Sequence, residues 1–170
     1  ISRNVVGVDY EPESDLLIAT QASRRVNVTS SKTALNGYQK GRCFYCFMNV
    51  GVSSDSADLA DVDHFFPHTL KQHKIAEPID GVWNLVLACR NCNRGEHGKF
   101  ARLPSLELLE RLRQRNDYLI GSHHPLRETL IMQTGKTLSE RMSFLQNAHA
   151  EAKRHLIHLW QPEALNDPAF

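Results

Sequence analysis

Hydrophobic positions in the last third of the chain recur three and four residues apart, which is the spacing of an amphipathic helix. The first such set begins after Ser105 and contains Leu108, Leu109, Leu112, Asn116, Leu119 and Ile120. Pro125 suits the first turn of a second helix, which we expect to run to about Gln133 before Gly135 breaks it. Two consecutive helices are therefore predicted here.

A third helix is predicted between a capping box at Thr137 and Glu140 and a stop at Pro162. Its apolar positions alternate steps of four and three, as in a heptad seam. The seam contains Leu138, Met142, Leu145, His149, Ala152, Leu156 and Leu159. Such a seam either packs on the two preceding helices or pairs with a second copy of the chain as a homodimer.

Shorter elements are predicted before residue 104. Ser30 or Ser31 caps a short helix that ends near Lys40. Strand-like apolar runs follow at residues 61–66 and 82–87, separated by segments rich in Gly, Pro, Ser and Asp. The fold class is therefore predicted as α+β.

Three regions follow from this pattern. Residues 1–29 form an N-terminal extension of undecided structure, residues 30–103 form a small α+β core, and residues 104–170 form a helical C-terminal region. The chain has 170 residues, which is the size of one domain or a core with appendages. Because it begins with Ile1, it is either free-standing or a piece of a longer protein.

Composition excludes some classes of protein. The chain is 41% hydrophobic and 23% charged, which is ordinary for a globular protein. Its net charge is +1, so any surface that binds nucleic acid must be locally basic. No apolar run approaches the ~20 residues of a membrane span, and no targeting segment is visible, so we expect a cytoplasmic protein.

Four cysteines stand in two Cys-x-x-Cys pairs, Cys43 with Cys46 and Cys89 with Cys92. In a reducing compartment such pairs indicate a metal site rather than disulfides. Four thiolates close a tetrahedral zinc site with no open position, so we predict a structural Zn²⁺. The alternative is a set of buried or redox-active cysteines, but the thioredoxin-like unit that usually carries a redox pair is not visible here.

Polar residues suited to hydrolysis lie between and beside these pairs. His64 is a candidate general base because the pKa of an unperturbed histidine lies near neutrality. Asp63 and Asn93 offer oxygen ligands to a hard divalent cation such as Mg²⁺ or Mn²⁺. Asn84 is a candidate for fixing the orientation of the His64 ring or its backbone.

The order of these motifs resembles that of the HNH endonuclease family, the ββα-metal or His-Me finger nucleases. The residues that carry the resemblance are Cys43-Phe44-Tyr45-Cys46, Val62-Asp63-His64-Phe65-Phe66-Pro67 and the run from Asn84 to Gly95. It covers about residues 40–100 and implies a small ββα-metal core clipped by the Cys₄ zinc.

The family resemblance assigns roles to individual residues. It implies that His64 activates water, Asp63 and Asn93 hold the catalytic Mg²⁺ or Mn²⁺, and Asn84 orients His64. Asn93 stands where the family often has a final histidine, so this is an HNN-type variant, and His97 is an alternative ligand. The implied activity is hydrolysis of phosphodiester bonds in double-stranded DNA, in a free-standing nuclease or in a module of a restriction or defence protein.

Basic residues after the second cysteine pair are candidates for phosphate contacts. They are Arg90, Arg94, Lys99 and Arg102, and Arg111, Arg113 and Arg115 continue the run as either phosphate contacts or a solvated helix face. Two other functions remain open at this point. One is a zinc-knuckle module that binds nucleic acid without catalysis, and the other is an RNase that uses the same site.

Overall fold

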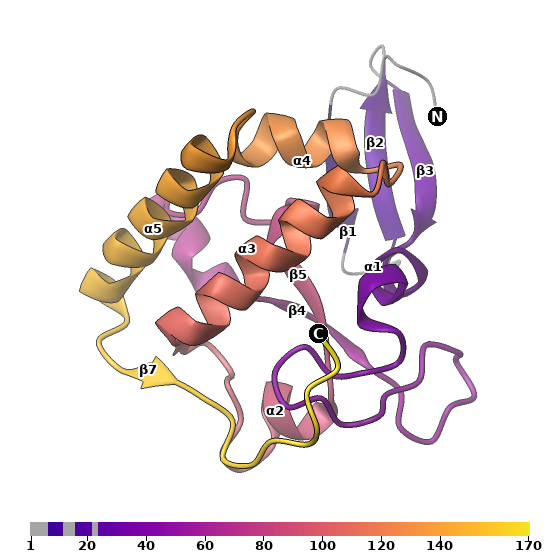
Figure 1. Cartoon of the computed structure of the whole chain (residues 1–170), viewed down its shortest axis with the longest axis vertical. Coiled ribbons are helices and arrows are strands. Elements are labelled where there is room, and N and C mark those ends of the chain that lie inside the picture. The colour runs from indigo at the N-terminus through magenta and orange to yellow at the C-terminus, as the bar shows by residue number, and fades with distance from the viewer. Residues whose placement is uncertain (1–6, 12–15, 22–23) are drawn as a thin grey trace.

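The computed structural model describes residues 7–11, 16–21 and 24–170 (Figure 1). Short strands and several helices make up this part of the chain, so the predicted α+β class is confirmed. Within the described ranges, every helix is too short or too polar to cross a lipid bilayer.

An antiparallel sheet of three strands precedes the first helix, in the region whose structure the sequence left undecided. Val8 and Leu17 are buried and attach this sheet to the main core. The register pairs Val8 with Ala19 and Leu17 with Thr29. The strands are β1 (Gly7–Glu11), β2 (Leu16–Gln21) and β3 (Arg24–Ser30).

The centre of the fold is a pair of antiparallel strands followed by a short helix. In the register of the two strands, His64 lies opposite Leu85. Every residue of the second strand is buried, which explains its continuous apolar sequence. The elements are β4 (Asp61–His64), the 3₁₀ helix η2 (Val82–Asn84), β5 (Leu85–Ala88) and α2 (Arg90–Arg94). Another 3₁₀ helix, η1 (His68–His73), follows β4.

The predicted helices are present, with small shifts at their ends. Ser105 caps the first long helix by accepting the N–H of Leu108, and the capping box of Thr137 and Glu140 is formed. The helices are α1 (Ser31–Gln39), α3 (Leu106–Gly121), α4 (Arg127–Thr134) and α5 (Leu138–His155).

The last helix ends earlier than predicted, because the chain leaves it to form a parallel pair of short strands. β7 (Leu159–Trp160) pairs with β6 (Leu103–Pro104), and the Ser105 N–H donates to the Trp160 carbonyl at 3.0 Å. Trp160 is buried, and its Nε1–H donates to the His97 carbonyl. These contacts tie the end of the helical region to the segment that follows α2.

The seam of α5 is only partly covered. Leu145, His149 and Ala152 are buried where α5 packs on α3 and α4. Leu138 and Met142 at the start of the same seam are 49% and 38% exposed. Packing within the chain therefore accounts for the buried half of the seam, and the homodimer stays a prediction.

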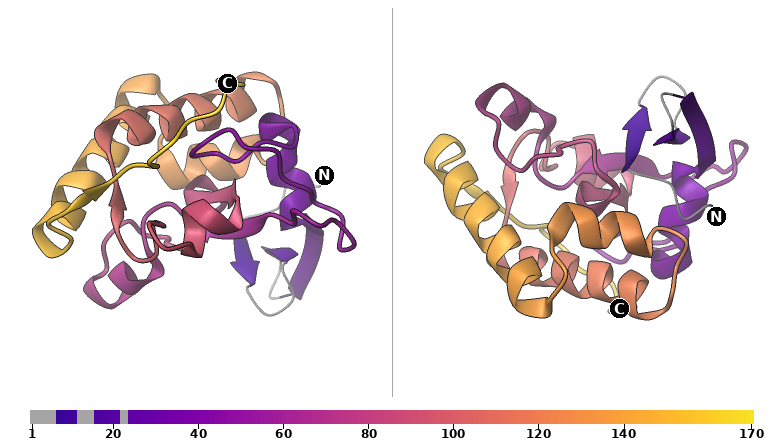
Figure 2. Two further views of the ribbon diagram at one scale, coloured as in Figure 1. Left: turned by 90° about the horizontal axis from the view of Figure 1, so that it is seen from below. Right: turned by 90° about the horizontal axis from the view of Figure 1, so that it is seen from above.

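The segment after β7 runs past α2 and ends beside the loop that follows α1 (Figures 1 and 2). The backbone N–H and the side-chain amide of Asn166 both donate to the Cys46 carbonyl, at 2.9 and 3.1 Å. The Phe170 ring packs against Tyr38 and Phe47, with centroids 5.0 and 4.9 Å apart. This segment therefore lies over the turn that carries Cys43 and Cys46, called the first cysteine turn below.

Candidate metal centre and active site

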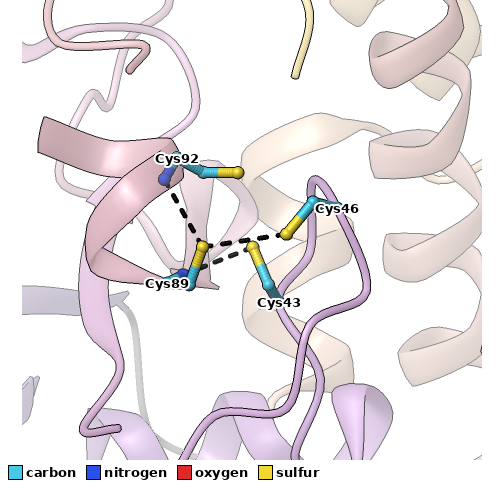
Figure 3. A group of neighbouring side chains, drawn as sticks. All are labelled: Cys43, Cys46, Cys89 and Cys92. Carbon is cyan, nitrogen blue, oxygen red and sulfur yellow. Dashed lines mark hydrogen bonds between the residues drawn. The ribbon is translucent and has the colours of Figure 1, made fainter. Parts of the chain in front are cut away.

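The four cysteines come together in a buried cluster, as Figure 3 shows. Their sulfur atoms all lie within 4.8 Å of one another. Cys43 and Cys46 come from the turn after α1, whereas Cys89 and Cys92 lie at the start of α2. The sequence prediction that the two pairs form one site is confirmed.

The spacing of the sulfurs fits a tetrahedral metal ion. A Zn–S bond of about 2.3 Å places tetrahedral sulfurs ~3.8 Å apart, and the Sγ atoms of Cys46 and Cys89 are 3.7 Å apart. Hydrogen bonding among the four thiols lowers the pKa of Cys46 to about 7 and lowers that of Cys89, and it raises the pKa of Cys43 and of Cys92. Because four neighbouring thiolates repel one another, a cation such as zinc at the centre is what stabilises them together.

His64 lies at the end of β4, and its side chain is only 13% exposed. Its Nε2 atom is 2.9 Å from the Asp80 carboxylate, and its ring lies 5.2 Å from that of His68. Burial lowers the pKa of His64, and this effect outweighs the hydrogen bond to Asp80, which raises it. The imidazole is therefore neutral near pH 7, the state that a general base requires.

Asp80 is the site residue that sequence reasoning missed. It lies in the turn between residues 78 and 81, where an Asp before a Gly carries no signal beyond the turn itself. Its side chain contacts Lys71 as well as His64, and Asp80 and Lys71 border an open cavity of ≈ 290 Å³. The carboxylate thus lies between His64 and this cavity.

Asp63 points away from His64 into the protein. Its carboxylate accepts a hydrogen bond from the Tyr45 hydroxyl at 2.6 Å and pairs with the Lys99 ammonium at 3.1 Å. The Lys99 side chain is 0% exposed and also donates to the carbonyls of His64 and Phe100. The negative charge of Asp63 is therefore already balanced by a buried cation.

Asn93 contacts a different carboxylate. Its Nδ2 atom donates to Asp61 at 3.0 Å, and Arg94 pairs with the same carboxylate at 3.0 Å. Asp61 and Asp63 share one face of β4, but the structure gives no contact between Asp63 and Asn93 among the residues it describes. The two expected ligands of the catalytic ion are thus engaged separately.

Asn84 holds the backbone that follows His64 rather than the imidazole itself. Its Oδ1 accepts the Phe66 N–H at 2.7 Å, and its Nδ2 donates to the carbonyls of Phe66 and Ile79. The side chain is completely buried, and all these partners are main-chain atoms. Asn84 therefore joins the end of β4 to the turn that carries Asp80.

The basic residues separate into exposed and buried groups. Arg90, Arg94 and Arg102 are exposed and remain candidates for phosphate contacts. The prediction that Lys99 contacts nucleic acid is wrong, because its ammonium is enclosed against Asp63. Arg115 is also fully buried and donates to the carbonyls of η2 and β5, so this position is structural.

Two other arginines of α3 are also engaged within the protein. Arg111 donates to the carbonyls of Phe44 and Tyr45 in the first cysteine turn. Arg113 pairs with Glu110 and Asp117 on its own helix. The arginines of α3 therefore stabilise the fold through contacts within the protein, and they do not form a free phosphate-binding face.

Comparison with known proteins adds no relative. No protein-family model, curated protein or solved structure matches this chain.

Proposed function

We propose that this chain is an HNH-type endonuclease that hydrolyses phosphodiester bonds in double-stranded DNA, with His64 as the general base. The observation that supports this most directly is the His64–Asp80 pair, 2.9 Å apart, at the end of β4. A buried imidazole with a lowered pKa is suited to accept a proton from water at neutral pH. The strand, strand and helix order of β4, β5 and α2 agrees with the core that the resemblance implies.

In this proposal zinc occupies the Cys₄ cluster and has a structural role. Four thiolates leave no open coordination position for water or substrate. The ion would join the turn after α1 to the start of α2, and β5 leads directly into that helix. Zinc therefore stabilises the frame that carries His64 and takes no part in the chemistry.

The two residues that the resemblance implies as ligands of a catalytic divalent ion are bound to other partners. Asp63 is paired with Lys99, and Asn93 is bonded to Asp61, so the described contacts do not form one set of ligands for Mg²⁺ or Mn²⁺. The steps we assign to this chain therefore involve His64 and Asp80 alone. Dependence of cleavage on Mg²⁺ or Mn²⁺ stays an expectation from the resemblance.

Exposed arginines beside α2 supply the expected contacts to the DNA backbone. Arg90, Arg94 and Arg102 lie on the surface of the segment that includes α2 and its C-terminal continuation. Guanidinium groups in such positions hold phosphates without reading sequence. If the chain is a module of a restriction or defence protein, another part of that protein would recognise the DNA sequence.

Plasmid cleavage tests the proposal. The purified chain is incubated with supercoiled plasmid in Mg²⁺, Mn²⁺ or EDTA, beside the His64→Ala variant. We expect nicking that His64→Ala reduces by about 10²–10⁴-fold, the usual contribution of a general base. His158→Ala, which removes an exposed histidine, is the matched control and is expected to cleave normally.

The same assay separates the competing functions. Equal activity of His64→Ala and the unaltered chain would refute the assignment of the base. DNA binding without cleavage in any metal would favour the zinc-knuckle binding module. Faster cleavage of RNA than of DNA under the same conditions would favour the RNase.

A further inference from the structure

The turn that carries Asp80 is held firmly from both sides. The indole N–H of Trp83 and the backbone N–H of Gly81 both donate to the Pro78 carbonyl at 2.9 Å. The backbone N–H of Tyr10 in β1 donates to the Asp80 carbonyl at 2.9 Å. A Cβ atom at Gly81 would lie 2.7 Å from the Trp83 ring, so the close approach of this turn requires glycine. Asp80 is thus presented in one fixed place.

Three nitrogen-bearing side chains converge on the Asp80 carboxylate. His64 Nε2 lies 2.9 Å and His68 Nε2 lies 3.5 Å from Oδ1, and Lys71 Nζ lies 3.1 Å from Oδ2. Burial by itself would raise the pKa of Asp80, but the hydrogen bonds from His64 and Lys71 outweigh it and hold the pKa below its ordinary value. Asp80 is therefore ionised and accepts hydrogen bonds at neutral pH.

A carboxylate next to a neutral imidazole decides which ring nitrogen carries the proton. An ionised carboxylate only accepts hydrogen bonds, and a neutral histidine has one donor and one acceptor nitrogen. Nε2 of His64 must therefore be the donor, and the lone pair is left on Nδ1. Among the described residues, Nδ1 has no hydrogen-bond partner, so it is the nitrogen available to a water molecule.

We propose that Asp80 is the positioning residue of this site, which fixes His64 in the Nε2–H tautomer with Nδ1 as the proton acceptor. The inference rests on the proposed nuclease function. When Nδ1 takes a proton from water, the water oxygen bonds to phosphorus and the bond from phosphorus to the leaving oxygen breaks. The leaving oxygen keeps the bonding electron pair and takes a proton from solvent. The imidazolium that results keeps its Nε2–H on Asp80, whose charge stabilises it while Asp80 itself stays ionised.

His68 does not replace His64 in this arrangement. The His68 side chain is 54% exposed, and its nitrogen lies farther from the same carboxylate oxygen. Its position on η1, one turn before Lys71, leaves it in a longer ion-pair contact with Asp80, without the hydrogen bond that holds His64. Of the two histidines near Asp80, His64 is therefore the one held in a fixed orientation, because it is closer to the carboxylate and more buried than His68.

Nitrogen NMR of the full chain tests the tautomer without any need for cleavage. Histidine labelled with ¹⁵N is observed near pH 8, and the His64 ring signals are assigned by their loss in His64→Gln. We expect a protonated Nε2 and an unprotonated Nδ1 in the unaltered chain. Asp80→Asn places an amide donor beside the ring and is expected to shift the population toward the Nδ1–H tautomer, and Asp80→Glu is expected to restore the original signals in part.

Kinetics on the same variants link the tautomer to catalysis. Asp80→Asn is expected to lower kcat by about 10²-fold, the lower end of a general-base contribution, with little change in KM. Glu151→Gln makes the same kind of chemical change on an exposed carboxylate of α5, away from this cavity, and it is expected to leave tautomer and kcat unchanged.

The two readouts separate this inference from the proposed function. An Nδ1–H tautomer in the unaltered chain, or ring signals that Asp80→Asn does not alter, would overturn the role of Asp80 even in an active nuclease. If the chain cleaves no nucleic acid but the tautomer responds as expected, the positioning role stands and the nuclease proposal fails.

Discussion

The buried pair of Lys99 and Asp63 allows a direct test of the structure around the site. Lys99→Met keeps most of the side-chain volume and removes the ammonium group. The side chains of Lys99 and Asp63 are 0% and 9% exposed, so water does not replace the lost charge. The ammonium also donates to the carbonyls of His64 and Phe100, which lose a partner as well.

The expected loss of stability is large compared with that of a surface ion pair. Removing one partner of a buried pair costs about 3–5 kcal/mol, because it leaves an uncompensated charge in the interior. A domain of this size has a total free energy of unfolding of about 5–15 kcal/mol. Lys99→Met is therefore expected to lower the free energy of unfolding by a large fraction of its total. It also removes the hydrogen bond to the His64 carbonyl.

Denaturant unfolding measures this loss, and a double-mutant cycle assigns it to the pair. Asp63→Asn combined with Lys99→Met removes both charges and is expected to be less destabilised than Lys99→Met alone. Lys71→Met breaks an ion pair in which the lysine is 58% exposed, and its cost is expected to stay below about 1 kcal/mol. A loss of less than ~1 kcal/mol in Lys99→Met would show that Asp63 is not held by Lys99.

Two further predictions concern the metal and the pH dependence of stability. Removal of zinc from the Cys₄ cluster is expected to unfold the core, because the apparent binding free energy of a structural zinc, about 10–16 kcal/mol, matches or exceeds the stability of a domain. Circular dichroism and metal analysis of the zinc-free protein check this. An unfolding curve that does not change on metal removal would contradict it. Burial lowers the pKa of His149 below its ordinary 6.5, so its contribution to stability is full above about pH 6.5 and is lost as the pH falls through the lower folded-state pKa. Unfolding free energies between pH 7.5 and 5.5 should therefore fall more steeply in the unaltered chain than in His149→Gln, and equal slopes would count against it.

The Lys99–Asp63 pair also bears on the catalytic ion that the resemblance implies. A divalent cation at Asp63 would have to displace an ammonium that makes several buried contacts. If Lys99→Met binds Mg²⁺ or Mn²⁺ more tightly than the unaltered chain, the two cations compete for one carboxylate. The same Lys99 side chain thus stabilises the fold and occupies the carboxylate that a divalent cation would need.

Local signals in the sequence were sufficient for the starts of α3 and α5 and for the cysteine cluster. The caps at Ser105 and Thr137 act through hydrogen bonds within a few residues, so the sequence determines where these helices begin. The two Cys-x-x-Cys pairs have the spacing of a tight turn, and buried thiols that suit one metal ion have few other arrangements. The α+β class follows from the same short-range patterns.

Long-range contacts decided the surroundings of the site. That Asp63 faces Lys99 rather than Asn93 depends on how the segment after α2 folds back on β4, and no local pattern reports that packing. Asp80 reaches His64 only because main-chain and indole hydrogen bonds hold its turn beside β4. The sequence alone determined where α3 and α5 start and which four cysteines gather in one cluster. Only the tertiary structure decided which charged side chains pair with one another. Ion pairing depends on the distance between two groups and on their burial, and residues far apart in the sequence come close together only when the chain folds.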